Sequence, residues 1–153
     1  MARICSNNKI TTDKFNSLAS GRAALDEAND CSVNAVAIAC DVDYVVANVA
    51  LEWAGRKHRK GSYRWEQEAA INKLGFKTSK VDWRKFVSKY PGRHKNLKSV
   101  TSHHMDRFNK VWADGNTYLV YTDGHVFAVV NGVNHDWTKG RAFRVNEIML
   151  VYK

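Results

Sequence analysis

Cys31 heads an almost wholly apolar stretch, a position where a thiol can act as a nucleophile. Residues 30–40 read DCSVNAVAIAC. We expect residues 31–40 to form a helix buried in the core, with Cys31 in its first turn and Asn29 or Asp30 as its cap. The free N–H groups and the dipole of a helix N-terminus favour an anion, and therefore favour a thiolate over a thiol. The alternative is that Cys31 is a small buried residue without a chemical role.

The chain has two further cysteines, three in all, and this odd, small number fits reduced thiols better than a disulfide framework. Cys40 comes nine residues after Cys31. At about 100° per residue it points away from Cys31 on a helix, so we expect an inert core residue. Cys5 lies in a polar segment and gives no pattern.

A base for Cys31 is found in residues 124–137, GHVFAVVNGVNHDW, where Asn131-Gly132 predicts a two-residue hairpin turn. Val130 would then pair with Val133. Counting outward places five side chains on one face: His125, Phe127, Asn134, Asp136 and Thr138. Asp136 becomes the diagonal neighbour of His125, and a carboxylate so placed orients a histidine for general base catalysis. The alternative is a surface ion pair.

The other histidines predict no metal site. His103 and His104 are adjacent and diverge on a helix, and His135 points to the opposite face from His125. The sequence has neither a Cys-x-x-Cys nor a His-x-x-x-His pattern. We therefore expect no metal and no cofactor.

The elements that would position Cys31 are helical. Helices are predicted at 43–55, capped by Asp43, and at 62–75, capped by Ser62, each ended by a glycine, with a strand at 76–81 after them. Each helix would pack through an apolar set: Val45, Val46, Val49, Ala50 and Trp53 in the first, and Trp65, Ala69, Ile71 and Leu74 in the second. Shorter helices are predicted within 11–30, ending near Gly21, and at 81–92 and 99–112.

The last third of the chain alternates as strands do, with Asp-Gly, Asn-Gly and Lys-Gly turns between them. The predicted strands are 116–122, 125–131, 133–138, 142–145 and 148–153. Helices followed by an antiparallel sheet predict an α+β fold. A chain of 153 residues is most simply one domain, 1–153, with 1–28 as a partly irregular N-terminal extension.

The formal net charge is +9, and basic residues occur in three clusters, at residues 55–61, 83–98 and 138–144. These are either solvated loops or surfaces that attract nucleic acid or acidic partners, with Tyr63 and Trp65 able to stack on bases. No recognised nucleic-acid motif accompanies them, so we expect only weak, nonspecific binding. No apolar run reaches the roughly 18 residues of a membrane helix, and no signal-peptide core is visible, which favours a cytoplasmic location without membrane partners.

The order of helix-start cysteine, helices, strand histidine and downstream aspartate resembles that of papain-like cysteine peptidases. The closer likeness is to the bacteriocin-leader peptidase branch, in the string Asp30-Cys31-Ser32-Val33-Asn34-Ala35, in residues 69–77 and in residues 124–133. The chain also resembles small phage and prophage proteins over residues 29–138. The resemblance implies a papain-like fold, N-terminal helices packed on a C-terminal antiparallel sheet, with a Cys31-His125-Asp136 triad.

In this family a glutamine stands about six residues before the nucleophile, whereas the corresponding residue of this chain is Leu25. The family's acid or amide also lies farther beyond the histidine, and its Asp-Pro pair is missing. Asn29, Asp30 and Ser32 are therefore the candidates for the oxyanion hole or substrate contacts. Arg56, Lys57 and Lys60 are candidates for a basic rim of the cleft that favours an acidic substrate.

The resulting hypothesis is a phage-encoded, thiol-dependent hydrolase of a peptide, isopeptide or other amide bond, acting on a peptide or protein in the host cytoplasm. An amidase, a deamidase or an acyltransferase is an alternative of the same chemistry. The alternative of another class is an inactive papain-like scaffold that binds nucleic acid or an acidic host protein. The sequence does not distinguish substrates or oligomeric states.

Overall fold

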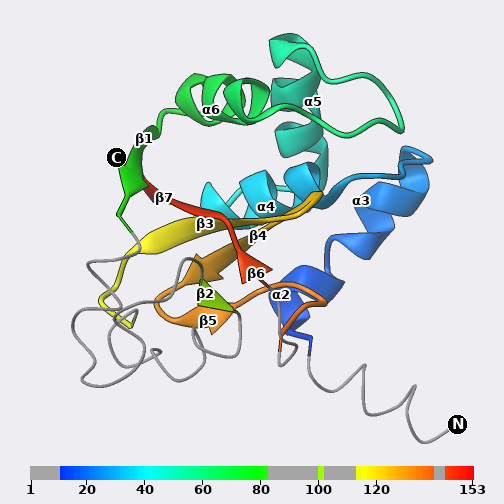
Figure 1. Ribbon diagram of the computed structural model, residues 1–153. Helices are drawn as coiled ribbons and strands as arrows, with labels where there is room; N and C mark the ends of the chain where they lie inside the picture. Colours follow the sequence, from blue (N-terminus) through cyan, green and yellow to red (C-terminus); the bar gives the residue numbers. More distant parts are fainter. Residues whose placement is uncertain (1–10, 83–99, 102–112, 140–143) are drawn as a thin grey trace, which may run out of the picture.

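The computed structural model describes residues 11–82, 100–101, 113–139 and 144–153 (Figure 1). Helices fill the first half of the chain and an antiparallel sheet fills the second, so the predicted α+β class is confirmed. The helices are α2 (Asp13–Asn16), α3 (Ala19–Ala24), α4 (Cys31–Ala39), α5 (Tyr44–Ala54) and α6 (Arg64–Lys73). The helix predicted at 81–92 lies almost wholly outside the described residues, as does 99–112 apart from 100–101, which are a strand.

The strands are β1 (Lys77–Val81), β2 (Val100–Thr101), β3 (Thr117–Thr122), β4 (His125–Val130), β5 (Val133–Asn134), β6 (Arg144–Val145) and β7 (Glu147–Tyr152). Five of them form one sheet in the order β1-β7-β3-β4-β5, and β2 pairs with β6. Every pairing is antiparallel. The predicted strands therefore exist, but 133–138 ends early, at Asn134.

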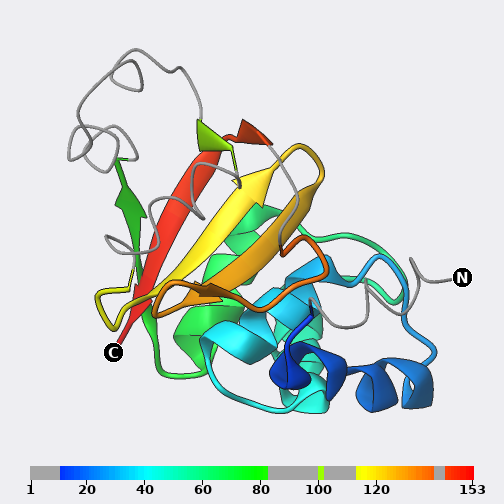
Figure 2. The same ribbon diagram turned by 90° about the horizontal axis from the view of Figure 1, so that it is seen from below.

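Helices α4, α5 and α6 lie on one face of the large sheet, with α4 directly against it (Figures 1 and 2). The core between them joins Val33, Val36 and Ile38 of α4 to Leu119, Ala128 and Met149 of the sheet. Alternate strand residues such as Val120, Phe127 and Ile148 are buried on the opposite face. Helix α4 is apolar on all sides because its surroundings are apolar on all sides.

The buried face predicted for α5 is wrong. Val45, Val46, Val49 and Trp53 are all exposed, Trp53 by 61%. Of the predicted set only Ala50 is buried, and the face that packs consists of Tyr44, Ala47, Asn48, Ala50 and Leu51. Both faces of this helix are largely apolar, and the face that contains Ala47 and Ala50 allows neighbouring elements to approach more closely. Trp65 of α6 is likewise exposed, and its ring stacks on Tyr63 with centroids 6.3 Å apart.

The sequence predicts a helix that ends near Gly21, but α3 continues through this residue to Ala24. A Cβ at this position would lie 2.7 Å from Cβ of Tyr44. The glycine therefore allows α3 to approach the start of α5. The N-terminal segment is also tied to the sheet, since Thr12 Oγ1 and His135 Nδ1 are 2.7 Å apart. In the described part of the chain, no helix has both the length and the apolar composition to cross a membrane alone.

Candidate active site

Cys31 is the first residue of α4, as predicted, and Asp30 is the N-cap. The Asp30 side chain does not cap the helix. Its Oδ2 accepts a hydrogen bond from the Tyr44 hydroxyl at 2.8 Å and lies 3.3 Å from Arg22 Nε. The N–H groups of the first turn of α4, which have no intrahelical acceptors, therefore remain free of this carboxylate and can face an anion at Cys31.

His125 begins β4 and is held by Asp136, whose Oδ2 lies 2.8 Å from His125 Nε2. The same oxygen accepts from the Thr138 N–H at 3.2 Å, and Asp136 is only 2% exposed. This pairing confirms the predicted contact. The carboxylate is buried and fixed by two donors, so it is more than a surface ion pair.

The route to this contact differs from the predicted one. Val130 pairs with Val133 and Val129 with Asn134, as expected from the Asn131-Gly132 turn. The ladder then ends at Asn134, so Asp136 and Thr138 do not share a strand face with His125 as the outward count had predicted. Residues 136–138 turn instead, with Asn134 Nδ2 donating to Thr138 Oγ1 at 3.1 Å. The turn brings Asp136 directly against His125.

Aromatic rings enclose the histidine. The Trp137 ring is tilted against the His125 ring with centroids 5.1 Å apart, and Phe127 lies 6.0 Å from it. Apolar cover of this kind limits the access of water to the His125–Asp136 bond and strengthens it. Sequence reasoning missed Trp137, although its position directly after Asp136 could have indicated it.

Cys31 and His125 line the same two hollows, so the thiol lies beside the imidazole. Burial alone would lower the pKa of His125, but hydrogen bonds and charge interactions with Asp136 and Cys31 raise it from 6.5 to about 9. Because Nε2 is bonded to Asp136, Nδ1 is the ring nitrogen that can exchange a proton with the thiol. The raised pKa of His125 favours a protonated imidazole beside the Cys31 side chain.

Cys40 differs from Cys31, as predicted. It is 3% exposed in the apolar core, and burial raises the pKa of its thiol to about 12. A thiol in this setting stays protonated and unreactive at neutral pH.

Two hollows flank the Cys31–His125 pair, and both are lined by Cys31, His125, Gly61 and Gly124. The larger, of about 390 Å³, adds Phe15, Arg22, Asn29, Asp30, Asn34, Asp136 and Trp137. The smaller, of about 230 Å³, adds Ser32, Ser62, Arg64, Gln67, Tyr121, Thr122 and Val126. The pair therefore sits between two spaces that can hold the two sides of a scissile bond.

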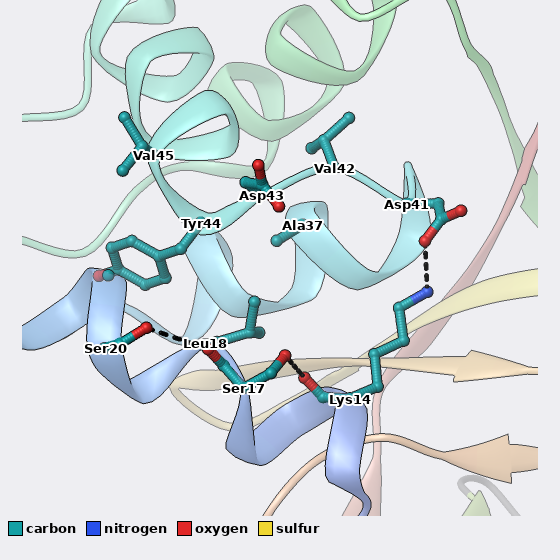
Figure 3. A pocket seen from close by; sticks show the side chains of 11 residues that line it. Lys14, Ser17, Leu18, Ser20, Ala37, Asp41, Val42, Asp43, Tyr44 and Val45 are labelled. Atoms are coloured by element: carbon teal, nitrogen blue, oxygen red, sulfur yellow. Dashed lines mark hydrogen bonds and ion pairs between the residues drawn. The ribbon is translucent and has the colours of Figure 1, made fainter.

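A still larger hollow, of about 530 Å³, lies between the N-terminal helices and the turn from α4 to α5 (Figure 3). Lys14 reaches Asp41 across it, with Nζ and Oδ1 2.9 Å apart. Its lining includes neither Cys31 nor His125, so it is separate from the candidate site.

The three oxyanion candidates differ in what they can donate. Asn29 lines the larger hollow, but its Nδ2 already donates to the Arg59 carbonyl at 3.0 Å. Asp30 accepts hydrogen bonds and is not a donor. Ser32 is 1% exposed, and its Oγ has no hydrogen-bond partner in the described part of the protein. The remaining donors are the backbone N–H of Cys31, at the start of α4, and the buried hydroxyl of Ser32, the next residue.

Gln67 is a further side chain at the site that sequence reasoning missed. It lines the smaller hollow, donates from Nε2 to Ser62 Oγ at 3.1 Å, and accepts from the Tyr121 hydroxyl at 2.8 Å. Nothing in the sequence indicates it, because it reaches the site only through the packing of α6 beside α4.

The prediction that Arg56 lines the cleft rim is wrong. Arg56 is 3% exposed and forms a two-pronged ion pair with Glu27, at 3.1 and 3.3 Å. Lys57 and Lys60 are exposed and line a neighbouring hollow. The basic residues that line the two site hollows are instead Arg22 and Arg64, which the sequence did not single out.

Among the described residues, no group of three or more His, Cys, Asp and Glu side chains is arranged to hold a metal ion. Comparisons with protein-family models, with curated proteins and with solved structures found no match.

Proposed function

We propose that this protein is a thiol-dependent hydrolase of a peptide, isopeptide or other amide bond, built on a papain-like fold. The observation that carries the proposal is a histidine that is bonded to a buried carboxylate and lines the same two hollows as a thiol at a helix N-terminus. A nucleophile, a base and a group that orients the base are together the minimum for this chemistry.

In the first step, the Cys31 thiolate attacks the carbonyl carbon and forms a C–S bond. The protonated His125 gives its proton to the leaving nitrogen as the C–N bond breaks, which leaves an acyl-thioester on Cys31. In the second step, His125 takes a proton from water, the resulting hydroxide attacks the thioester, and the thiol is released with the acid. Asp136 keeps the imidazole oriented and stabilises its charged form in both steps.

The tetrahedral intermediates carry negative charge on the former carbonyl oxygen. The Cys31 N–H at the positive end of α4 and the Ser32 hydroxyl are the groups that would stabilise this charge. An unpartnered buried hydroxyl beside the nucleophile supports this assignment, because such groups are otherwise unfavourable. It offers a replacement for the glutamine expected near Leu25.

The resemblance to small phage proteins supports a phage-encoded enzyme that acts on a peptide or protein in the host cytoplasm. The second candidate is a binding protein for nucleic acid or an acidic host protein. It is favoured by the net charge of +9 and by the exposed aromatic rings of Trp53, Tyr63 and Trp65. Retention on DNA that falls steeply with salt, without thiol chemistry, would favour this candidate.

The enzyme is tested by incubating the protein with a complex peptide library and identifying new N-termini by mass spectrometry. The wild type is expected to generate them, and Cys31→Ala and His125→Ala are not. Cys40→Ser serves as the control, and should cleave if it folds. A wild-type protein that releases no product and forms no acyl-thioester would overturn the proposal.

A further inference from the structure

The basic loop, residues 55–61 (GRKHRKG), is fastened to the segment that precedes Cys31 by three of its side chains. Arg56 pairs with Glu27, His58 Nε2 lies 2.9 Å from the Leu25 carbonyl, and Arg59 donates to Asp26. The loop backbone is bound as well: Asn29 Nδ2 donates to the Arg59 carbonyl, and the Arg59 N–H donates to the Glu27 carboxylate. The loop is therefore held in a fixed place beside the candidate site.

Lys57 and Lys60 take no part in this anchoring. Both are exposed, and within the described residues neither ammonium group has an ion-pair or hydrogen-bond partner. They line a hollow of about 520 Å³, with Tyr63 and Glu66 on its other side. The Glu66 carboxylate is buried and accepts from the Tyr63 N–H at 2.7 Å, and the two lysines outnumber this one carboxylate in the lining. The exposed charge of this hollow is therefore positive.

This basic-loop hollow adjoins the candidate active site, because the two share lining residues. Gly61 lines it and also lines both hollows beside Cys31. Ser62 lines it and the smaller of the two. A polypeptide ligand that extends from the Cys31–His125 pair across Gly61 would therefore reach the two lysines.

Nothing in the folding of the loop requires glycine at position 61. Its φ lies outside the left-handed region, and a Cβ placed there would meet no atom within 4 Å. By contrast, Gly55 has a φ of +122°, which disfavours other residues. Gly61 therefore presents no side chain at the place where the three hollows adjoin, which allows another polypeptide backbone to approach closely.

We propose that Lys57 and Lys60 form an exosite for an acidic segment of a polypeptide substrate, whose main chain passes over Gly61 to Cys31. This inference depends on the proposed hydrolase. Two exposed ammonium groups beside an exposed tyrosine suit the carboxylates of Asp and Glu side chains. A polypeptide is favoured over nucleic acid because the adjoining site holds the Cys31 thiol, whose chemistry is acyl transfer.

The test uses chloroacetyl peptides, in which the Cys31 sulfur forms a bond to the methylene carbon and chloride leaves. Each peptide carries a Gly-Ser spacer followed by four Glu, four Ser or four Lys residues, and its rate is divided by that of chloroacetamide on the same variant. In low salt, the Glu peptide is expected to exceed the Ser peptide about tenfold, with the Lys peptide slowest. This advantage should shrink as salt is raised.

The double variant Lys57→Glu/Lys60→Glu should reverse the order of the Glu and Lys peptides. Its matched control is Lys73→Glu/Lys77→Glu, which changes the net charge equally on α6 and β1 and should keep the wild-type order. Gly61→Val should lower the relative rate of all three peptides without lowering the melting temperature. Equal rates for the three peptides, or equal effects of the two double variants, would overturn the exosite.

The failure of the exosite and the failure of the hydrolase are distinguishable. The chloroacetamide rate compared between wild type and His125→Ala reports on the Cys31–His125 pair alone. An unreactive peptide with four Glu residues should protect Cys31 from the reactive Glu peptide. Stronger protection by oligothymidylate at equal concentration would show that the groove prefers nucleic acid, and would refute the polypeptide assignment.

Discussion

Replacing Asp136 with asparagine removes the charge that holds His125 and preserves the shape of the side chain. The pKa of His125 stands at about 9 against an ordinary 6.5, with Asp136 a main cause of the rise and Cys31 the other. In Asp136→Asn the burial of the ring remains while the carboxylate charge is lost. The pKa of His125 should therefore fall, because burial favours the neutral ring.

The size of the effect follows from the linkage between proton binding and folding. A rise from 6.5 to about 9 corresponds to roughly 3 kcal/mol in favour of the folded, protonated state. Because the folded pKa is the higher one, this stabilisation is complete below pH 6.5 and is lost as the pH rises through about 9. Asp136→Asn should thus be less stable than wild type at pH 6, by up to roughly 3 kcal/mol, and the deficit should shrink toward pH 10.

Urea unfolding of both proteins at pH 6, 8 and 10 measures this difference. Iodoacetamide labelling of Cys31 at pH 7.5 measures its chemical consequence. The labelling rate should fall about tenfold if the pKa of His125 returns to its ordinary 6.5, because the protonated fraction of the ring at this pH then falls from nearly complete to about a tenth. A stability difference that stays constant from pH 6 to pH 10, together with superimposable labelling profiles, would refute the reasoning. Asp136 would then be a structural residue with no influence on the charge of His125.

Three further outcomes follow from burial and packing. Iodoacetamide applied to the folded protein at pH 8 should leave Cys40 unmodified, as peptide mass mapping would show, and rapid modification would mean that α4 is wrongly placed. Arg56→Leu removes the ion-pair partner of the buried Glu27 carboxylate, so urea unfolding should show a loss of about 3–5 kcal/mol, against less than about 0.5 kcal/mol for Lys57→Ala. Gly21→Val should lower stability by about 1–3 kcal/mol through its clash with Tyr44, and an unchanged melting temperature would contradict the close packing of α3 on α5.

The sequence was sufficient for the parts of the site that depend on local rules. Asn131 and Gly132 both have positive φ, +47° and +79°, as the predicted hairpin turn demands, and the turn determined the register beside it. The helix start at Cys31 followed from a polar-to-apolar boundary. The early end of β5 could not be read in the same way, because it depends on a side-chain bond from Asn134 to Thr138 that an alternating pattern does not reveal.

The errors arose where a distant partner decides the outcome. Arg56 was expected at the surface because charged residues usually are, and it is buried because Glu27, 29 residues away, neutralises it. The exposed valines of α5 and the approach of Gln67 to Cys31 have the same origin. A periodic pattern shows that a helix has an apolar face, but not which of two apolar faces the neighbouring helices will cover.

The central claim is that His125 and Cys31 work as one ionised pair. It is tested most directly by the second-order rate of iodoacetamide labelling at Cys31, measured at pH 7 in wild type and in His125→Ala. With Cys40 serving as the internal unreactive thiol, we predict a rate at least tenfold lower in His125→Ala, because the group that holds the sulfur as an anion is gone. Equal rates in the two proteins would contradict the pair, and with it the proposed hydrolase.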